Sequence, residues 1–173
     1  MRSSKTDRIL LGVLAVLFAG FLYTIRNSFE QRIVQKGDSA PGFSVTTDSG
    51  KRISRSDFGG KLLVLNFWAT WCPPCVEELP SLHQFAQQVG DSGVVVLGVS
   101  IDKSEQNYKR FLQRNRVAFE TARDPDANIA AEYGTFKWPE TYVIGKDGKV
   151  LQKYIGPVEW TDPKVIASIR EML

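Results

Sequence analysis

The two cysteines of the chain, Cys72 and Cys75, are separated only by two prolines. Two intervening residues let the thiol of Cys75 reach the sulfur of Cys72, so the pair can form a disulfide and can resolve a mixed disulfide with another protein. Pro73 and Pro74 keep this loop short and stiff, and Pro73 suits a first helical position because its missing N–H has no partner there. The spacing therefore predicts dithiol redox chemistry.

Three other uses of the cysteines are disfavoured. A structural zinc site normally takes four Cys or His ligands, whereas the chain offers two cysteines and His83. A purely structural disulfide would more often close a long loop. The Pro-x-x-x-Thr-x-x-Cys pattern of peroxiredoxins fails, because Thr70 lies two residues before Cys72. We therefore expect no metal and no cofactor beyond the redox-active Cys72–Cys75 disulfide itself.

The segments around the cysteines indicate how they are positioned. Residues 62–68 are almost all apolar, as in a buried strand, and from Val76 onward apolar residues recur at helical spacing. The pair therefore lies on a strand-to-helix turn, where free backbone N–H groups and the helix dipole favour an anion. The pKa of the Cys72 thiol should fall below that of a free cysteine, and the thiolate is the form that attacks disulfides.

The rest of the chain has an α/β order. Two short strands near 43–47 and 51–53 join at a turn, and two later strands join at a second turn that contains Asp147 and Gly148. The other expected elements are strands at 94–101, near Phe119, at 141–144 and at 149–155, and helices at 104–115, 127–133 and 163–173.

Residues 9–25 carry no charge and are at the short end for a membrane-spanning helix. Arg2, Lys5 and Arg8 precede them, which favours a cytoplasmic N-terminus. A cleaved signal peptide and a buried helix are the alternatives, but the apolar run ends without a clean small-x-small cleavage site. We therefore expect a single-pass anchor within 1–25, a tether at 26–40 and a catalytic domain at 41–173.

The formal net charge of +3 belongs to the N-terminal part. Positions 1–36 hold six of the 22 basic and two of the 19 acidic residues, which leaves 16 basic and 17 acidic residues in the remainder. No nucleic-acid-binding face is indicated. The basic cluster of Lys109, Arg110, Arg114 and Arg116 reads as the solvated face of a helix.

The segment from Leu65 to Cys75 resembles the active-site segment of membrane-anchored thioredoxin-like proteins of the TlpA, ResA and CcmG (DsbE) group, and the resemblance covers roughly 37–173. It implies a thioredoxin fold with an N-terminal β-hairpin extension. It also implies a protein-disulfide reductase on the extracytoplasmic side of a bacterial inner or cytoplasmic membrane, supplied by a membrane dithiol donor.

A later segment, 133–142, resembles the Gly-x-Pro-Glu-Thr signature of CcmG, the branch that supplies reductant to cytochrome c maturation. Apocytochrome c is therefore a possible client. The segment departs from that signature at Lys137 and Trp138, where small residues are usual.

The resemblance also implies roles for individual residues. Pro139 would be the cis-proline that faces the dithiol, and the backbone of Trp138 would pair with an incoming peptide strand. Trp71 would flank the reactive sulfur, and Pro73 and Pro74 would complete the docking surface.

Resolution of a mixed disulfide requires that Cys75 lose its proton. Asn66 stands where thioredoxin has a buried Asp, and it cannot titrate. Glu140 is therefore the expected proton acceptor, as in CcmG-like proteins, with a pKa raised by burial. Glu77 and Glu78 are expected to face solvent.

Two other functions share this pattern. A disulfide-forming oxidase would differ only in how far the Cys72 thiolate is stabilised. A non-enzymatic chaperone or tethering module would use the same groove for binding alone. Replacement of Cys72 by Ser separates the enzyme from the binding module.

Overall fold

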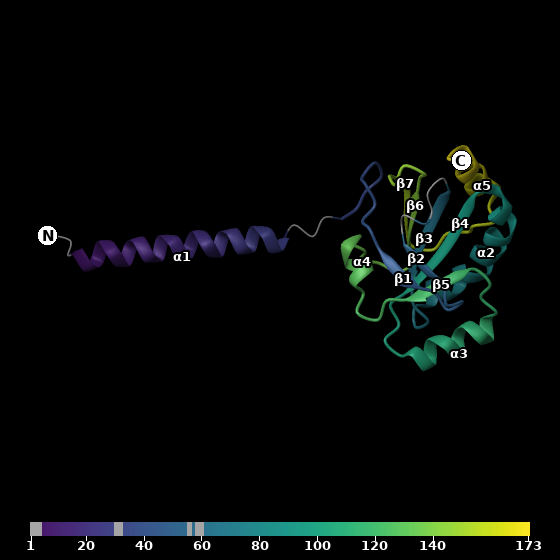
Figure 1. The fold of residues 1–173 in the computed structure, drawn as a ribbon, viewed down its shortest axis with the longest axis horizontal. Coiled ribbons are helices and arrows are strands. Elements are labelled where there is room, and N and C mark those ends of the chain that lie inside the picture. Colours follow the sequence, from purple (N-terminus) through teal and green to yellow (C-terminus); the bar gives the residue numbers. More distant parts are fainter. Residues whose placement is uncertain (1–4, 30–32, 55–56, 58–60) are drawn as a thin grey trace. The chain divides into compact units, whose positions relative to one another are not determined.

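The computed structural model describes the whole chain except residues 1–4, 30–32, 55–56 and 58–60 (Figure 1). The chain divides into two compact units, Met1–Arg32 and Ile33–Leu173.

The first unit contains helix α1 (Lys5–Phe29). Its segment Asp7–Ile25 has a mean hydropathy of 2.1 and no buried residue, so by length and composition it is able to cross a membrane. The expected anchor lies within this helix, which also takes in the first residues of the expected tether. Arg2, which belongs to the expected positive flank, lies outside the described residues.

The second unit is built on a five-stranded sheet in the order β5-β4-β3-β6-β7. Its strands are β3 (Leu62–Trp68), β4 (Val94–Ser100), β5 (Glu120–Arg123), β6 (Glu140–Ile144) and β7 (Val150–Ile155). The first three are parallel, whereas β6 and β7 are antiparallel to their neighbours. All seven residues of the central strand β3 are buried. The α/β class is confirmed, as is the predicted hairpin at the end of the sheet.

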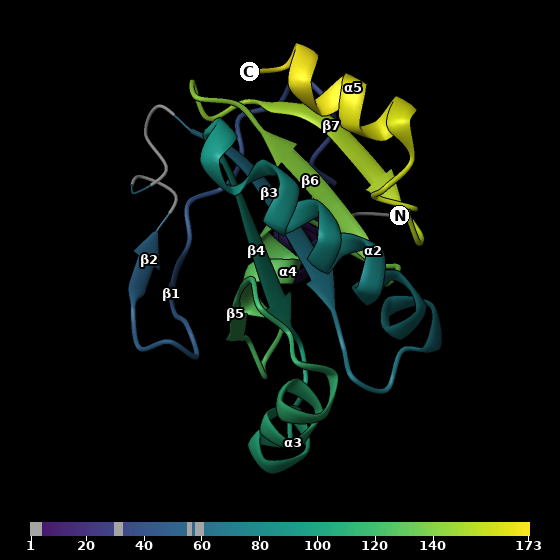
Figure 2. The ribbon, with the colours of Figure 1, turned by 90° about the vertical axis from the view of Figure 1, so that its right-hand side faces the viewer.

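Helices cover both faces of this sheet (Figure 2). Their bounds are α2 (Pro73–Val89), α3 (Glu105–Asn115), α4 (Asn128–Glu132) and α5 (Pro163–Glu171), with a 3₁₀ turn, η2 (Gly90–Ser92), after α2. Alternation along β3 sends Leu62, Val64 and Trp68 into the core that holds both cysteines and contacts from α2, α3 and α5. We call this side of the sheet the dithiol face.

The opposite side, which we call the back face, has a separate core. Leu63, Leu65 and Phe67 of β3 pack there with residues of α4. The antiparallel hairpin of β1 (Ser44–Thr46) and β2 (Arg52–Ser54) contributes to the same core. The expected N-terminal hairpin therefore exists, with strands of three residues each.

Part of the expected tether packs on the folded unit. Val34 and Ala40 are buried. The N–H of Val34 donates to the carbonyl of Tyr133 at 3.1 Å, and the N–H of Gly37 donates to the carbonyl of Val150 at 2.7 Å. Residues 33–40 therefore belong to the domain rather than to a free linker, while residues 30–32 of the expected tether lie outside the described residues.

Candidate active site

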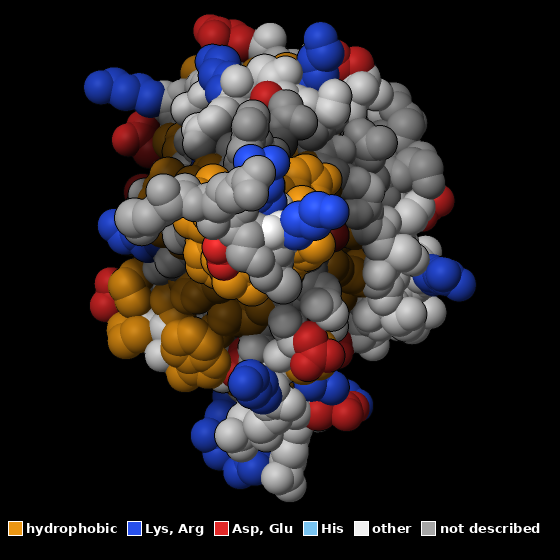
Figure 3. All heavy atoms as spheres, turned by 90° about the vertical axis from the view of Figure 1, so that its left-hand side faces the viewer, with side chains coloured by type: hydrophobic (Ala, Val, Ile, Leu, Met, Phe, Trp, Pro, Cys, Tyr) orange, Lys and Arg blue, Asp and Glu red, His pale blue; other side chains and the backbone are white. Residues whose placement is uncertain are grey.

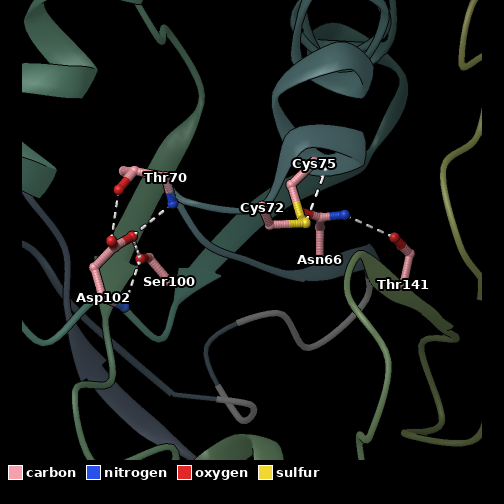
Figure 4. Close-up of a disulfide and its surroundings, with 7 residues drawn as sticks. All are labelled: Asn66, Thr70, Cys72, Cys75, Ser100, Asp102 and Thr141. Carbon is pink, nitrogen blue, oxygen red and sulfur yellow. Dashed lines mark hydrogen bonds between the residues drawn. A yellow bond between two sulfur atoms is a disulfide. The ribbon is translucent and has the colours of Figure 1, made fainter.

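The cysteines form a disulfide at the N-terminus of α2, with their Cα atoms 5.3 Å apart (Figure 4). Cys72 is the N-cap residue of the helix, and its sulfur accepts the N–H of Cys75 at 3.3 Å. Pro73 follows at the start of the helix, and no acidic residue stands in the first turn. The positive end of the helix dipole is therefore not offset by a carboxylate of that turn, and it favours a thiolate at Cys72 when the pair is reduced.

The two cysteines are buried, whereas the residues next to Cys72 in the sequence are exposed. Cys72 and Cys75 are themselves buried, with 5% and 2% of their surface exposed. Trp71 is 60% exposed, and Pro73 and Pro74 are exposed as well. These three exposed side chains are the ones expected to contribute to a docking surface.

A cis-proline lies at the same end of the sheet. The peptide bond between Trp138 and Pro139 is cis, which confirms the prediction. The next residue, Glu140, opens β6 and pairs with Phe67, one residue before the end of β3. Trp138 is partly buried and packs against both cores. The fold thus brings segments that are some 65 residues apart in sequence to the same edge.

A buried carboxylate that the sequence reasoning missed holds the cysteine loop in place. One oxygen of Asp102 accepts the N–H of Thr70 at 2.8 Å and the hydroxyl of Ser100 at 2.6 Å, and the other accepts the hydroxyl of Thr70 at 2.6 Å (Figure 4). Asp102 comes directly after a strand parallel to the one that leads to Cys72. The carboxyl ends of parallel strands lie at the same edge of a sheet. The position of Asp102 after the strand expected at 94–101 could therefore have indicated that it lies near the cysteine loop.

Asn66 lies beside the disulfide on the dithiol face (Figure 4). It is buried, and its side-chain amide donates to the hydroxyl of Thr141 on β6 at 2.9 Å. An amide in this hydrogen bond links two strands but takes up no proton, so the proton acceptor for Cys75 lies elsewhere.

The side chain of Glu140 is not where the proton role requires it. It is fully buried, but one carboxylate oxygen accepts from the ammonium of Lys153 at 2.7 Å and from the hydroxyl of Tyr142 at 2.5 Å. Glu140 and Tyr142 are two residues apart on β6, so they share a face, and Tyr142 belongs to the back-face core. The expectation that the Glu140 carboxylate lies beside the dithiol is therefore wrong, because the strand alternation turns it to the other side of the sheet.

The ion pair of Lys153 and Glu140 on the back face has further contacts. The Lys153 ammonium also donates to the carbonyl of Val34 at 3.1 Å and lies 4.9 Å from the centre of the Tyr142 ring. Burial, and then the hydrogen bond to Glu140, raise the pKa of Tyr142 well above its ordinary value. The tyrosine therefore remains a neutral donor to the carboxylate.

The expectation that the side chain of Glu78 faces solvent is wrong. Glu78 is buried with only 5% of its surface exposed, and one oxygen accepts the indole N–H of Trp160. Its other oxygen has no hydrogen-bond partner among the described residues. Burial raises the pKa of Glu78 from 4.5 to about 7, against the opposing effect of the Trp160 hydrogen bond. Glu77, by contrast, is exposed as expected.

Glu78 is three residues after Cys75 on α2, a spacing that places two side chains on one face of a helix about 5–6 Å apart at their Cβ atoms. A carboxyl group that changes protonation near neutral pH therefore neighbours the buried cysteine. The sequence could have indicated this position of Glu78 through its three-residue spacing from Cys75, together with Leu79 and Leu82, which mark the buried side of α2.

Comparison with known proteins places this arrangement in a family. Residues 36–153 match the AhpC/TSA family. The chain belongs to the AhpC/TSA family. It is 35% identical over 157 residues to the thiol-disulfide oxidoreductase ResA of Bacillus cereus strain ATCC 10987, an alignment that covers 88% of this chain and 90% of the relative. ResA of Bacillus subtilis is 32% identical, with 90% and 88% covered.

A solved structure supports the same assignment for this AhpC/TSA family member. A thiol:disulfide interchange protein DsbE from Chlorobium tepidum superposes with a TM-score of 0.70 at 29% identity, covering 80% of this chain and 95% of that one. The predicted thioredoxin fold and the resemblance to the ResA and CcmG (DsbE) group are confirmed.

Proposed function

We propose that this protein reduces disulfides of client proteins outside the cytoplasm, with the Cys72–Cys75 dithiol as the reductant. The observation that carries the proposal is the placement of Cys72 at the N-cap of α2, with Pro139 at the same end of the sheet, in a chain similar to thiol-disulfide oxidoreductases. The helix N-terminus favours the thiolate that begins disulfide exchange.

The reaction proceeds in two exchanges. The Cys72 thiolate attacks one sulfur of the client disulfide, forms a mixed disulfide and releases the other client sulfur as a thiolate. Cys75 then loses its proton and attacks the Cys72 sulfur, which closes the Cys72–Cys75 disulfide and releases the second client sulfur. Two electrons pass from the enzyme to the client, and two protons, one from Cys75 and one from solvent, complete the client thiols.

Glu78 is the proposed proton acceptor for Cys75. A base works best when its pKa lies near the operating pH, and burial brings Glu78 to about 7. Glu140 is excluded from this role by its position on the back face and by its pairing with Lys153.

The docking surface of the proposed enzyme combines the cysteine loop with the cis-proline loop. Trp71, Pro73 and Pro74 would contact the client beside its cysteine, and the backbone of Trp138 before Pro139 would pair with an extended client segment. The apolar segment of α1 would anchor the protein by a single pass, with a membrane dithiol protein as electron donor. Apocytochrome c is the proposed client, on the resemblance to the CcmG branch.

The reduction potential of the Cys72–Cys75 pair tests the direction of the reaction. The full-length protein in non-ionic detergent is equilibrated with dithiothreitol or glutathione buffers, and its oxidised fraction is measured. We expect a value of about −200 to −230 mV or lower, as in glutaredoxins and thioredoxin. A value near the roughly −120 mV of a strong oxidant would make the protein a disulfide donor instead.

Replacement of single cysteines tests the order of the two exchanges. Cys75→Ser should accumulate a mixed disulfide with the client, because the resolving thiol is absent. Cys72→Ser should give no mixed disulfide and no turnover. Full function of Cys72→Ser in cells would instead indicate a binding module.

A further inference from the structure

The exposed Trp71 borders a hollow of about 290 Å³ that the mechanism does not use. Its lining consists of Thr70, Trp71, Asn107, Arg110, Phe111 and Arg114. It therefore joins the loop that carries Cys72 to one side of α3. Two of its six lining residues are arginines, and none is acidic.

Helix α3 holds these arginines in a defined place. Tyr108 is fully buried, and Phe111 contacts the ring of Trp68 with 5.6 Å between ring centres. Asn107, Arg110 and Arg114 follow at three- and four-residue intervals, so they share one side of the helix. Because Trp68 ends the strand that leads to Cys72, the helix is fixed directly against the cysteine loop.

The positive charge of this surface is not neutralised by neighbouring carboxylates. No ion pair involves Arg110 or Arg114 in the part of the chain that the structure describes. The nearby Glu105 is paired with Lys109 at 2.5 Å and with Arg123 at 3.6 Å. Arg110 makes only a long hydrogen bond, 3.4 Å, to the side chain of Asn107.

The basic character is local. Positions 37–173 hold 16 basic and 17 acidic residues, a net charge of −1, so the domain as a whole does not attract anions. At the end of the molecule where α3 lies, Lys and Arg side chains stand together with Asp and Glu side chains (Figure 3). Within the hollow itself the charged lining residues are Arg110 and Arg114, and they would attract a partner of opposite charge to the surface beside Trp71.

We propose that Arg110 and Arg114, together with Trp71, form a subsite for an acidic segment of the client next to its disulfide. This inference rests on the proposed function, because it names the kind of client that the dithiol would meet. Guanidinium groups bind carboxylates with two parallel hydrogen bonds, and the exposed indole provides an apolar surface for the peptide chain. The client would carry Asp or Glu within a few residues of the cysteine that Cys72 attacks.

Two disulfide-containing peptides test this inference with the reduced full-length protein in non-ionic detergent. One carries Asp and Glu beside its cysteines, and the other carries Asn and Gln at the same positions. The rate of reduction is measured for the native protein, for Arg110→Glu/Arg114→Glu and for the matched control Lys61→Glu/Lys149→Glu. The control makes the same change in net charge with exposed lysines at the far ends of β3 and β7 from the cysteine loop.

We expect the native protein to reduce the acidic peptide about tenfold faster than the neutral one at low salt, with the preference fading at high salt. Arg110→Glu/Arg114→Glu should lose this preference, whereas the lysine control should keep it. Equal rates for the two peptides, or equal loss of preference in the control, would overturn the subsite.

Reaction of the oxidised protein with dithiothreitol separates this inference from the proposed function. Dithiothreitol attacks as a thiolate but carries no peptide segment for the subsite to bind, so the native protein and the lysine control should react with it at the same rate. A native protein that reacts with dithiothreitol but reduces neither peptide would contradict the reductase function, and the subsite with it. Equal reduction of both peptides would contradict the subsite alone.

Discussion

Two buried glutamates lie on opposite faces of the same sheet, and their surroundings differ in one respect. Glu140, on the back face, has a cation and a neutral hydroxyl as partners, Lys153 and Tyr142. Glu78, on the dithiol face, accepts the neutral indole N–H of Trp160 and has no cationic partner among the described residues. Glu140 forms a buried ion pair with Lys153, whereas burial raises the pKa of Glu78 to about 7. The first suits a structural link, and the second suits proton transfer.

The largest expected effect comes from removal of the cation on the back face. Lys153→Met leaves Glu140 buried without its charged partner, and such a change typically costs about 3–5 kcal/mol of unfolding free energy. Denaturant unfolding at neutral pH measures it. The double variant Lys153→Met/Glu140→Gln should lose less, because no unpaired charge remains. Lys149→Met, at an exposed position, should change stability by less than about 0.5 kcal/mol.

The second prediction concerns the pH dependence of stability. The raised pKa of Glu78 means that the folded protein keeps a proton that the unfolded chain loses. Its contribution is therefore fully present below pH 4.5 and is lost as the pH rises to about 7. The unfolding free energy should fall over this range by about 3 kcal/mol relative to Glu78→Gln, which does not titrate.

Unfolding curves of the native protein, Glu78→Gln and Glu77→Gln from pH 4 to 8 provide the measurement. Glu77→Gln, at the exposed neighbouring position, should follow the native curve. A constant difference between the native protein and Glu78→Gln at every pH would show that the carboxyl group keeps an ordinary pKa.

The third prediction concerns the role of Glu78 in resolution of the mixed disulfide. Loss of a positioned acid or base typically slows a step by about 100-fold, so Glu78→Gln should slow the resolution of the mixed disulfide by roughly that factor. It should also remove an inflection near pH 7 from the pH profile of that step. Stopped-flow measurement of client release provides both values.

Glu140→Gln, assayed under conditions in which it remains folded, should keep the pH profile of the native protein. If instead it abolished the inflection while Glu78→Gln kept it, the assignment of roles to the two faces would be reversed.

The smallest expected effect concerns a third buried carboxylate, Asp102, whose partners are all hydrogen-bond donors of the loop and of Ser100. In Asp102→Asn an amide N–H₂ replaces one acceptor oxygen, so one donor loses its partner. We expect a loss of about 1–3 kcal/mol in unfolding free energy. If the loop geometry sustains the Cys72 thiolate, the apparent pKa of Cys72 in an alkylation assay should rise as well. An unchanged alkylation profile would limit Asp102 to stability.

The sequence was most informative where the signal is local. The cysteine spacing, the apolar strand before it and the helical period after it are all contained within 62–89, and the structure confirms each of them. The hairpin of β6 and β7 followed from the turn residues between them, and the cis peptide before Pro139 followed from the resemblance.

It was least informative where a partner comes from a distant segment. Glu78 is buried because Trp160, 82 residues later, closes over it, and no local pattern announces that contact. Glu140 meets Lys153 only through the pairing of β6 with β7. Alternation along β6 places the side chain of Glu140 on the same face of the sheet as Tyr142, not on the face of Val143. The expectation that Glu140 lies near the dithiol followed instead from its position next to Pro139.

The contact of Lys153 with the carbonyl of Val34 bears on where the chain can be shortened. A soluble version that starts at Gly37, within the expected tether, would delete the Val34 carbonyl, which accepts from Lys153, and the Val34 side chain, which is 97% buried. Val34 and Lys153 are 119 residues apart in the sequence. The ammonium would lose one of its partners, and the first segment of the domain would no longer be fastened to Tyr133. A cut before Ile33 keeps these links intact, so the boundary for a stable fragment is dictated by the back of the sheet rather than by the end of the apolar helix.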